Sequence, residues 1–332
     1  MRGTTVLPEC SSSSPDSPNW DAVFLCLIES CAMYLRKDDL VKQATLAARA
    51  GELEKAVEHL HASQEDIDKV AKALGCTFVQ LCDFAQQSPE EAIICQSGAF
   101  CGAFISDDVE KPFIGVAFKG SDGRDVITDI KWHPVQALQR PEIVWGAPTH
   151  RGFYFGLFGC FSEQQPGQIP FDVLQGQLSA IYENNARLHF TGHSLGGAYC
   201  TLAYGEFLRL QDDATFSQYN LGDLYSLAAP RTCLPPFSDE VNKRTQAGGG
   251  KYIFRIVNKE DPVPLIPPPP ISWEIALNPF IHVGGAWRIT DEGPEKMADE
   301  PPMVEPPQCE EMVFEDHDTR GYYASWQKTP HS

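Results

Sequence analysis

The spacing of apolar residues changes along the chain and divides it into two parts. Up to about residue 90, apolar residues recur at helical intervals, as Val23, Leu27, Cys31 and Leu35 do. This spacing predicts an all-helical N-terminal part, with helices over 21–50, 52–61, from 63 onward and over 77–87. From Glu91 on, short apolar runs of strand length alternate with helical stretches. The strands are expected at 92–95, 100–105, 113–118, around Leu188 and Phe190, and at 225–229 and 252–258.

Strands that alternate with helices predict an α/β fold with a largely parallel central sheet and helices on both faces. We expect a disordered tail over residues 1–18, which contain a Ser/Pro run. The helical segment 19–90 carries no catalytic pattern, and we expect it to pack on the core rather than form a domain of its own. We expect residues 91–328 to form the α/β domain, with active-site residues beyond the carboxyl ends of its strands.

One stretch joins a strand pattern directly to a helix pattern. Leu188 and Phe190 lie in a short apolar run, Gly192-His193-Ser194-Leu195-Gly196 follows, and apolar residues recur at helical spacing from Ala198 on. Strand, Gly-x-Ser-x-Gly and helix form the context of a nucleophile elbow. The two glycines let strand and helix approach closely, and the helix N-terminus directs N–H groups at developing negative charge. We therefore predict that Ser194 is a nucleophile.

A nucleophilic serine needs a histidine base and a carboxylate that orients the histidine. In this type of site, the chain order is serine, acid, histidine. Of the later histidines, His331 is the penultimate residue, and His282 lies in a strand-like run typical of a core histidine. We favour His317, which lies between a strand-like run at 312–314 and a helical pattern at 319–326.

The acid is expected directly after a strand. Asp261 follows the strand at 252–258 and precedes Pro262, a position that an ordinary turn aspartate can also occupy. Its rivals are Glu260 beside it and Asp223, which we place before its strand and therefore at the wrong end. We predict that two groups donate hydrogen bonds to the oxyanion of the reaction. One is the backbone N–H of Leu195, and the other belongs to Ser121, after the strand at 113–118. Gly120-Ser121-Asp122-Gly123 is also compatible with a generic turn.

A short amphipathic stretch follows this turn. Its apolar residues are Val126, Ile127, Ile130 and Trp132. Two interpretations stay open: a surface helix with one apolar face, and a movable lid over an apolar site.

Composition narrows the class of partner and the compartment. The formal net charge of −19 disfavours nucleic acid and strongly anionic membranes. None of the 11 cysteines forms a Cys-x-x-Cys pair, so no zinc site is indicated. We see neither a secretory signal nor an apolar run that reads as a membrane helix. We therefore expect a cytoplasmic protein with mostly free thiols, while secretion by an unconventional route stays open.

Taken together, the segments from about 93 to 326 resemble the class 3 lipases, the fungal-type triacylglycerol lipase family. The resemblance rests on five motifs in order: Phe118-Lys119-Gly120-Ser121, His150-Arg151-Gly152-Phe153, Thr191 to Gly197, Ala229-Pro230-Arg231 and Arg255 to Pro264. It implies an α/β-hydrolase fold with Ser194, Asp261 and His317 as triad and no metal or cofactor. It also implies that Ser121 and Leu195 are the oxyanion donors, and that about 122–132 is the position of the lid.

Two departures from the family stand out. Lys119 stands where the family usually has Arg, and the signal peptide and disulfides of secreted members are not evident. The predicted function is a lipase or esterase that acts on a lipid or another ester, with transient contact to a lipid interface left open. Alternatives on the same fold are a phospholipase A1, a monoacylglycerol lipase or an aromatic-acid esterase, and outside enzymes a catalytically silent interaction module.

Overall fold

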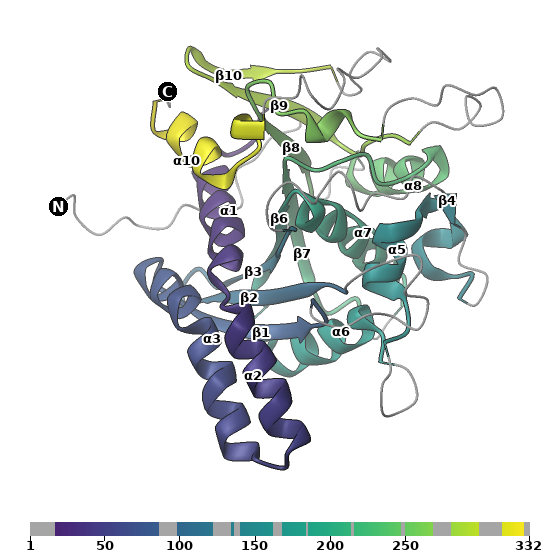
Figure 1. Cartoon of the computed structure of the whole chain (residues 1–332). Coiled ribbons are helices and arrows are strands. Elements are labelled where there is room, and N and C mark those ends of the chain that lie inside the picture. The colour runs from purple at the N-terminus through teal and green to yellow at the C-terminus, as the bar shows by residue number, and fades with distance from the viewer. Residues whose placement is uncertain are drawn as a thin grey trace.

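The computed structural model contains an eight-stranded sheet with helices on both faces (Figure 1). It describes residues 17–85, 98–121, 134–135, 140–161, 168–183, 185–213, 216–246, 250–267, 280–298 and 314–328. The strand order is β1-β2-β3-β6-β7-β8-β9-β10. These strands are β1 (Cys76–Asp83), β2 (Phe100–Ser106), β3 (Phe113–Phe118), β6 (Arg187–His193), β7 (Asn220–Leu227), β8 (Ile253–Asn258), β9 (Gly285–Thr290) and β10 (Gly293–Lys296).

The central strands run parallel, as the alternation of patterns predicts. Strands β3, β6, β7, β8 and β9 pair in parallel, whereas β1, β2 and β10 join antiparallel at the two edges. The predicted α/β class with a mostly parallel sheet is therefore confirmed. A separate pair is formed by β4 (Pro134–Val135) and β5 (Thr149–His150).

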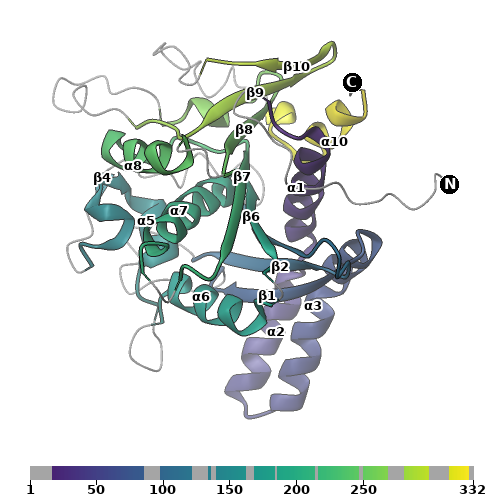
Figure 2. The same ribbon diagram turned by 180° about the vertical axis from the view of Figure 1, so that it is seen from behind.

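The helices divide between the two faces of the sheet (Figures 1 and 2). One apolar cluster joins the sheet to α5 (Arg151–Phe158), α6 (Pro170–Ile181), α7 (Leu195–Leu210) and α8 (Pro235–Gln246). A second cluster, on the other face, joins it to α1 (Trp20–Ala32), α3 (Leu53–Ala73) and α10 (Thr319–Lys328). Helix α2 (Asp38–Arg49) packs on α3, and short 3₁₀ helices lie at Met33–Leu35, Ile143–Gly146, Val263–Leu265 and Phe314–Asp316.

Strand β3 shows why helices must cover both faces of this sheet. Every residue of β3 is buried. Ile114, Val116 and Phe118 belong to the cluster on the α7 face, whereas Phe113 and Ala117 belong to the cluster on the α1 face. Because side chains alternate along a strand, a strand that is apolar at successive positions must bury both faces.

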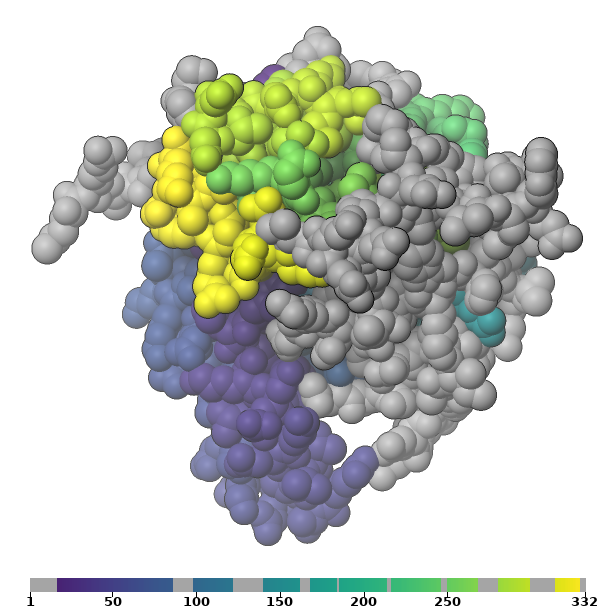
Figure 3. Space-filling model, turned by 45° about the horizontal axis from the view of Figure 1, so that its top comes forward, coloured from purple at the N-terminus to yellow at the C-terminus, as the bar shows by residue number. Residues whose placement is uncertain are grey.

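The C-terminal helix α10 packs against the N-terminal helix α1. Trp326 of α10 stacks on Phe24 of α1 with ring centroids 5.4 Å apart, and Trp20 contacts Trp287 of β9 edge-on at 5.6 Å. In the space-filling view the yellow C-terminal segment lies directly against purple α1 (Figure 3). This aromatic contact brings the residues just before α10 to the carboxyl ends of the central strands.

The predicted helix over 77–87 is wrong, because this stretch contains strand β1. Phe78, Leu81 and Cys82 have spacing that suits either element, and pairing decides between them. β1 pairs antiparallel with β2 over Cys76–Asp83, with a register shift between Gln80 and Cys82. The helical segment 19–90 therefore also supplies an edge strand of the sheet.

The expected helix over 21–50 is interrupted at Arg36 and Lys37. Arg36 has extended backbone (φ −58°, ψ 129°), and its buried guanidinium binds Asp83 of β1 and Asp38 at the start of α2. Conversely, the two helices expected on either side of Ser63 form one helix, α3. The Ser63 side chain is buried and donates to the Leu60 carbonyl at 2.6 Å, so it does not cap a helix.

Several expectations fall at or beyond the limits of the described residues. The tail up to residue 16, the strand at 92–95 and the lid stretch 122–132 lie outside them and stay predictions. The strand-like run at 280–283 forms only an isolated bridge between Ile281 and Cys233, and β9 begins at Gly285. Within the described part of the chain, every helix is too short or too polar to span a membrane.

The ion pairs of buried Arg36 with Asp83 and Asp38 predict a large effect on stability. Arg36→Met leaves the Asp83 carboxylate buried without its cation, and we expect the free energy of unfolding to fall by about 3–5 kcal/mol. Arg36→Met/Asp83→Leu should recover most of that loss. Lys69→Met, which removes an exposed ion pair with Asp66, serves as the control and should change little. Urea unfolding measures the stability of all three variants. Equal effects of Arg36→Met and Lys69→Met would show that the Arg36 ion pairs do not stabilise the fold.

Candidate active site

Ser194 occupies a strained turn between β6 and α7. Its backbone has φ 59° and ψ −126°, a conformation that non-glycine residues rarely adopt. Its N–H donates to the Leu227 carbonyl of β7 at 3.0 Å, and its carbonyl accepts from the Gly197 N–H at 2.9 Å. The turn is therefore fixed from both sides, as a nucleophile elbow requires.

Glycines permit this turn because backbone fills the space of their missing side chains. A Cβ on Gly192 would lie 2.2 Å from the Gly196 carbonyl oxygen, and one on Gly196 would lie 2.3 Å from the Phe118 carbonyl oxygen. Both contacts are with backbone, which cannot move aside as a flexible side chain can. The approach of strand and helix inferred from the sequence is thus present, and the end of β3 also packs against this helix start.

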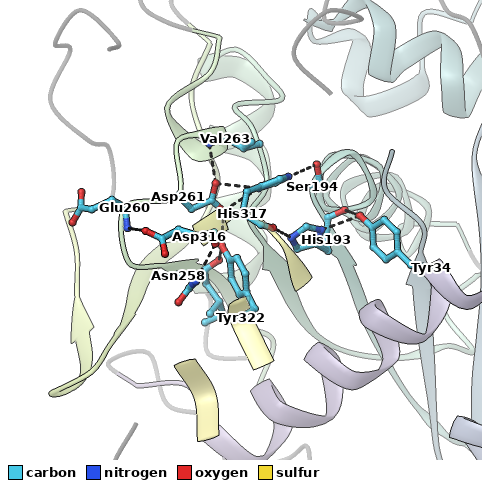
Figure 4. Close-up of polar contacts among 11 residues, drawn as sticks. Tyr34, His193, Ser194, Asn258, Glu260, Asp261, Val263, Asp316, His317 and Tyr322 are labelled. Atoms are coloured by element: carbon cyan, nitrogen blue, oxygen red, sulfur yellow. Dashed lines mark hydrogen bonds and ion pairs between the residues drawn. The ribbon is translucent and has the colours of Figure 1, made fainter. Parts of the chain in front are cut away.

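The structure brings Ser194, His317 and Asp261 into one hydrogen-bonded chain (Figure 4). His317 Nε2 lies 3.0 Å from Ser194 Oγ, and His317 Nδ1 lies 3.0 and 3.1 Å from the two carboxylate oxygens of Asp261. An ionised carboxylate only accepts hydrogen bonds, so Nδ1 carries the proton. Nε2 of a neutral imidazole is then the acceptor for the serine hydroxyl, which is the state a general base needs.

Two further donors fix the Asp261 carboxylate. The Val263 N–H donates to Oδ1 at 3.0 Å, and the Tyr322 hydroxyl donates to Oδ2 at 2.7 Å. Asp261 and Tyr322 are both buried, and Tyr322 comes from α10, five residues after His317. Burial and the negative charge of Asp261 hold the pKa of Tyr322 well above its usual value, so its proton stays in place as a donor. Sequence reasoning did not identify Tyr322.

His193, inside the elbow motif, holds the backbone of His317. Its Nε2 lies 2.8 Å from the His317 carbonyl oxygen and therefore donates to it, while its Nδ1 accepts from the Tyr34 hydroxyl at 2.9 Å. Burial is the main cause that depresses the pKa of His193 well below its usual value, so the ring is neutral. Sequence reasoning did not identify His193 or Tyr34. Tyr34 lies 159 positions from His193 along the chain, and His317 lies 124 positions from it, so no local pattern reveals these contacts.

The turn before His317 is tied to the end of β8. Asn258, the last residue of β8, donates from its side-chain nitrogen to the Asp316 carbonyl at 3.0 Å. Asp316 in turn accepts from the Glu260 N–H through its Oδ2 at 3.2 Å. These bonds place His317 beside Asp261 although 56 positions separate the two residues.

The loop after β3 lies against the serine. A Cβ on Gly120 would lie 2.5 Å from the His193 carbonyl oxygen and 3.2 Å from Ser194 Cβ. Ser121, the next residue, is the expected second oxyanion donor, and Leu195 begins α7. The first N–H groups of a helix have no partner within it, so the Leu195 N–H is available in this geometry. The buried Lys119 places its ammonium 5.4 Å from the centre of the Tyr34 ring.

The rival residues do not join this chain of hydrogen bonds. Glu260 is mostly exposed and pairs with Arg288 at 3.3 Å. Asp223 lies within β7, not before it as expected, and accepts from the Tyr252 N–H at 2.9 Å near the opposite end of the strand. His282 is buried and bonds the Pro264 carbonyl at 2.9 Å, as expected of a core histidine. His331 and the lid residues Val126, Ile127, Ile130 and Trp132 lie outside the described residues.

Gly196 gives a test of the elbow geometry. Gly196→Ala would drive a methyl group into the backbone of Phe118 and Lys119, and we expect destabilisation by about 1–3 kcal/mol together with loss of fluorophosphonate labelling of Ser194. The matched control is Gly176→Ala in α6, where nothing lies within 4 Å of the new Cβ. That change should be neutral or stabilising by up to about 1 kcal/mol. Normal labelling and stability of Gly196→Ala would show that the packing at the elbow is looser than described.

Part of this chain is similar to known lipases. Residues 115–270 match the family model for lipase (class 3), and this segment contains Ser194 and Asp261. The lipase of Rhizomucor miehei is 30% identical over 189 residues, which cover 57% of this chain and 44% of that lipase. The secreted mono- and diacylglycerol lipase 1 of Fusarium solani is 31% identical over 170 residues, which cover 50% and 43% of the two chains.

Solved structures include the Rhizopus niveus lipase II, with 22% identity, a TM-score of 0.48 and coverage of 76% of this chain and 82% of that one. The Rhizomucor miehei triacylglyceride lipase has 26% identity, a TM-score of 0.40 and coverage of 57% and 62%. The chain spans less than half the length of the curated relatives it matches. Its mostly parallel sheet and elbow have the α/β-hydrolase arrangement, and residues 115–270, just under half of the chain, match the class 3 lipase family.

Proposed function

We propose that this chain is a serine hydrolase that cleaves carboxylic esters of lipids. The observation that supports it best is the chain of hydrogen bonds from Ser194 through His317 to Asp261, with the serine on a strained elbow. Structural pairs of buried histidine and carboxylate occur without catalysis. A serine at positive φ in line with such a pair has no comparable structural purpose.

In the proposed reaction, His317 Nε2 takes the proton of Ser194 as Oγ attacks the ester carbonyl carbon. The tetrahedral oxyanion accepts hydrogen bonds from the Leu195 N–H and from Ser121. The alcohol leaves with the proton that His317 returns, and an acyl group stays on Ser194 Oγ. Water then attacks the acyl-enzyme with His317 again as base, which releases the acid and restores the serine. Asp261 stabilises the imidazolium in both halves.

The proposed lipid substrate rests on similarity to a family and not on a described acyl site. The match to the class 3 lipase family and the relatives named as lipases support an acylglycerol or similar ester. A phospholipase A1, a monoacylglycerol lipase and an aromatic-acid esterase use the same chemistry, so they remain alternatives. Transient contact with a lipid interface belongs to this proposal as well. A silent interaction module is the alternative outside enzymes.

The first test combines Ser194→Ala with nitrophenyl esters of two to sixteen carbons. Ester hydrolysis should fall by on the order of 10⁴-fold or more, and fluorophosphonate labelling should vanish. Ser238→Ala is the matched control, because Ser238 is also buried but bonds the Pro235 carbonyl in α8. Activity that survives Ser194→Ala would refute the mechanism.

The chain-length profile of the same assay separates the enzyme classes. A maximum at long acyl chains supports a lipase, and a maximum at short chains favours a small-ester or aromatic-acid esterase. If every ester is left intact and the fluorophosphonate does not label the wild type, the silent module replaces the hydrolase.

Tyr322→Phe tests the positioning of Asp261 separately. The change removes one donor on Asp261 Oδ2 and keeps the ring, so the carboxylate loses part of its fixed orientation toward His317. We expect kcat to fall by roughly 10-fold with KM little changed, the size expected for one hydrogen bond to a charged group. Tyr323→Phe is the control, because Tyr323 is partly exposed and its ring stacks on Phe24. Equal kcat for the two variants would exclude a positioning role for Tyr322.

A further inference from the structure

A second group of reactive side chains lies on the α1 face of the sheet, apart from Ser194. Cys26 and Glu29 are one helical turn apart on α1, and His189 comes from β6. One thiol sulfur, one carboxylate oxygen and one imidazole nitrogen of these residues all lie within 4.8 Å of one another. All three residues are fully buried.

The carboxylate of this group is only half satisfied. Glu29 Oε2 lies 2.7 Å from His189 Nε2. Glu29 Oε1 is also buried, and the structure gives it no hydrogen-bond partner among the described residues. A buried carboxylate is costly unless its charge is paired and its oxygens are bonded. The unpartnered oxygen therefore points to a cation that completes the site.

Gly115 leaves the space that such a site needs. A Cβ on this β3 residue would lie 2.2 Å from Glu29 Oε1 and 2.5 Å from His189 Nε2. Any larger residue would push the carboxylate and the imidazole apart. The Glu29 oxygen and the His189 nitrogen thus converge over the one position of β3 that carries no side chain on this face.

We propose that Cys26, Glu29 and His189 bind one Zn²⁺ ion. Thiolate, imidazole and carboxylate are all zinc ligands, with bond lengths of about 2.0–2.3 Å. Tetrahedral bonds of this length put ligand atoms roughly 3.3–3.8 Å apart, so separations under 4.8 Å close with small side-chain shifts. With three protein ligands, a water occupies the fourth position.

Binding changes protons but involves no redox step. The Cys26 thiol loses its proton to solvent as its sulfur binds zinc. In the metal-free site the His189 Nε2 proton lies in the hydrogen bond to Glu29. On binding, that proton is lost from Nε2, the neutral ring carries its one proton on Nδ1, and the Nε2 lone pair binds the metal. The ion offsets the carboxylate charge and joins α1 to β6. Because His189 lies on the α1 face, this zinc is structural and takes no part in ester cleavage.

The test measures metal content in the untagged full chain. Protein expressed with added zinc and passed through gel filtration should contain about one zinc per chain by elemental analysis. Cys26→Ala should lower that content at least 10-fold. Cys200→Ala is the matched control, because Cys200 is an equally buried thiol whose sulfur bonds the Gly197 carbonyl within α7, and it should keep the metal.

A spectroscopic readout keeps the test valid if a variant fails to fold. Wild-type protein refolded with Co²⁺ in place of Zn²⁺ should show a thiolate-to-cobalt charge-transfer band. Cys200→Ala should keep this band, and Cys26→Ala should lose it. Wild-type protein that refolds with neither zinc nor the cobalt band overturns the proposal, and so does equal metal loss in both cysteine variants.

Discussion

The positive φ of Ser194 is the constraint on which the rest of the site depends. An L-residue holds φ 59° only when its surroundings leave no alternative, and here backbone from three strands supplies them. β7 accepts the Ser194 N–H, β3 packs its last carbonyl against Gly196, and β6 ends directly before the turn. The pairing of β3, β6 and β7 in one sheet therefore holds this turn, and the two glycines allow the close approach of backbone that it requires.

His317 is held in position by other contacts than Ser194. His317 belongs to no strand of the sheet, and its position follows from contacts that hold its turn and the helix after it. Asn258 donates to the Asp316 carbonyl in this turn, and His193 donates to the His317 carbonyl. Trp326 holds α10 on α1 by stacking on Phe24. Ser194 and Asp261, which follow strands directly, thus meet a histidine that tertiary contacts hold in place. We expect the position of His317 to be more sensitive to changes elsewhere in the chain than the positions of Ser194 and Asp261.

How far the sequence predicts this molecule depends on the range of each interaction. The parallel sheet and the elbow at Ser194 follow from local periodicity and glycine spacing, and Asp261 and His317 follow from chain order. β1 could not be found that way, because its apolar spacing fits a helix and only pairing with β2 decides. The break at Arg36 likewise depends on Asp83, 47 positions away.

The contacts between α1 and β6 explain why the N-terminal segment is inseparable from the site. Glu29 and Ser30 of α1 bond to His189 and Thr191 of β6, and Tyr34 of the 3₁₀ helix that follows α1 bonds to His193, the last residue of β6. The last of these bonds ends one residue before Ser194 and continues to the His317 carbonyl. Polar bonds have a direction, whereas an apolar face can slide, so three bonds in register set the position of α1 along the strand. An N-terminal segment outside the residues that match the family model therefore fixes both β6, which leads into Ser194, and the backbone of His317.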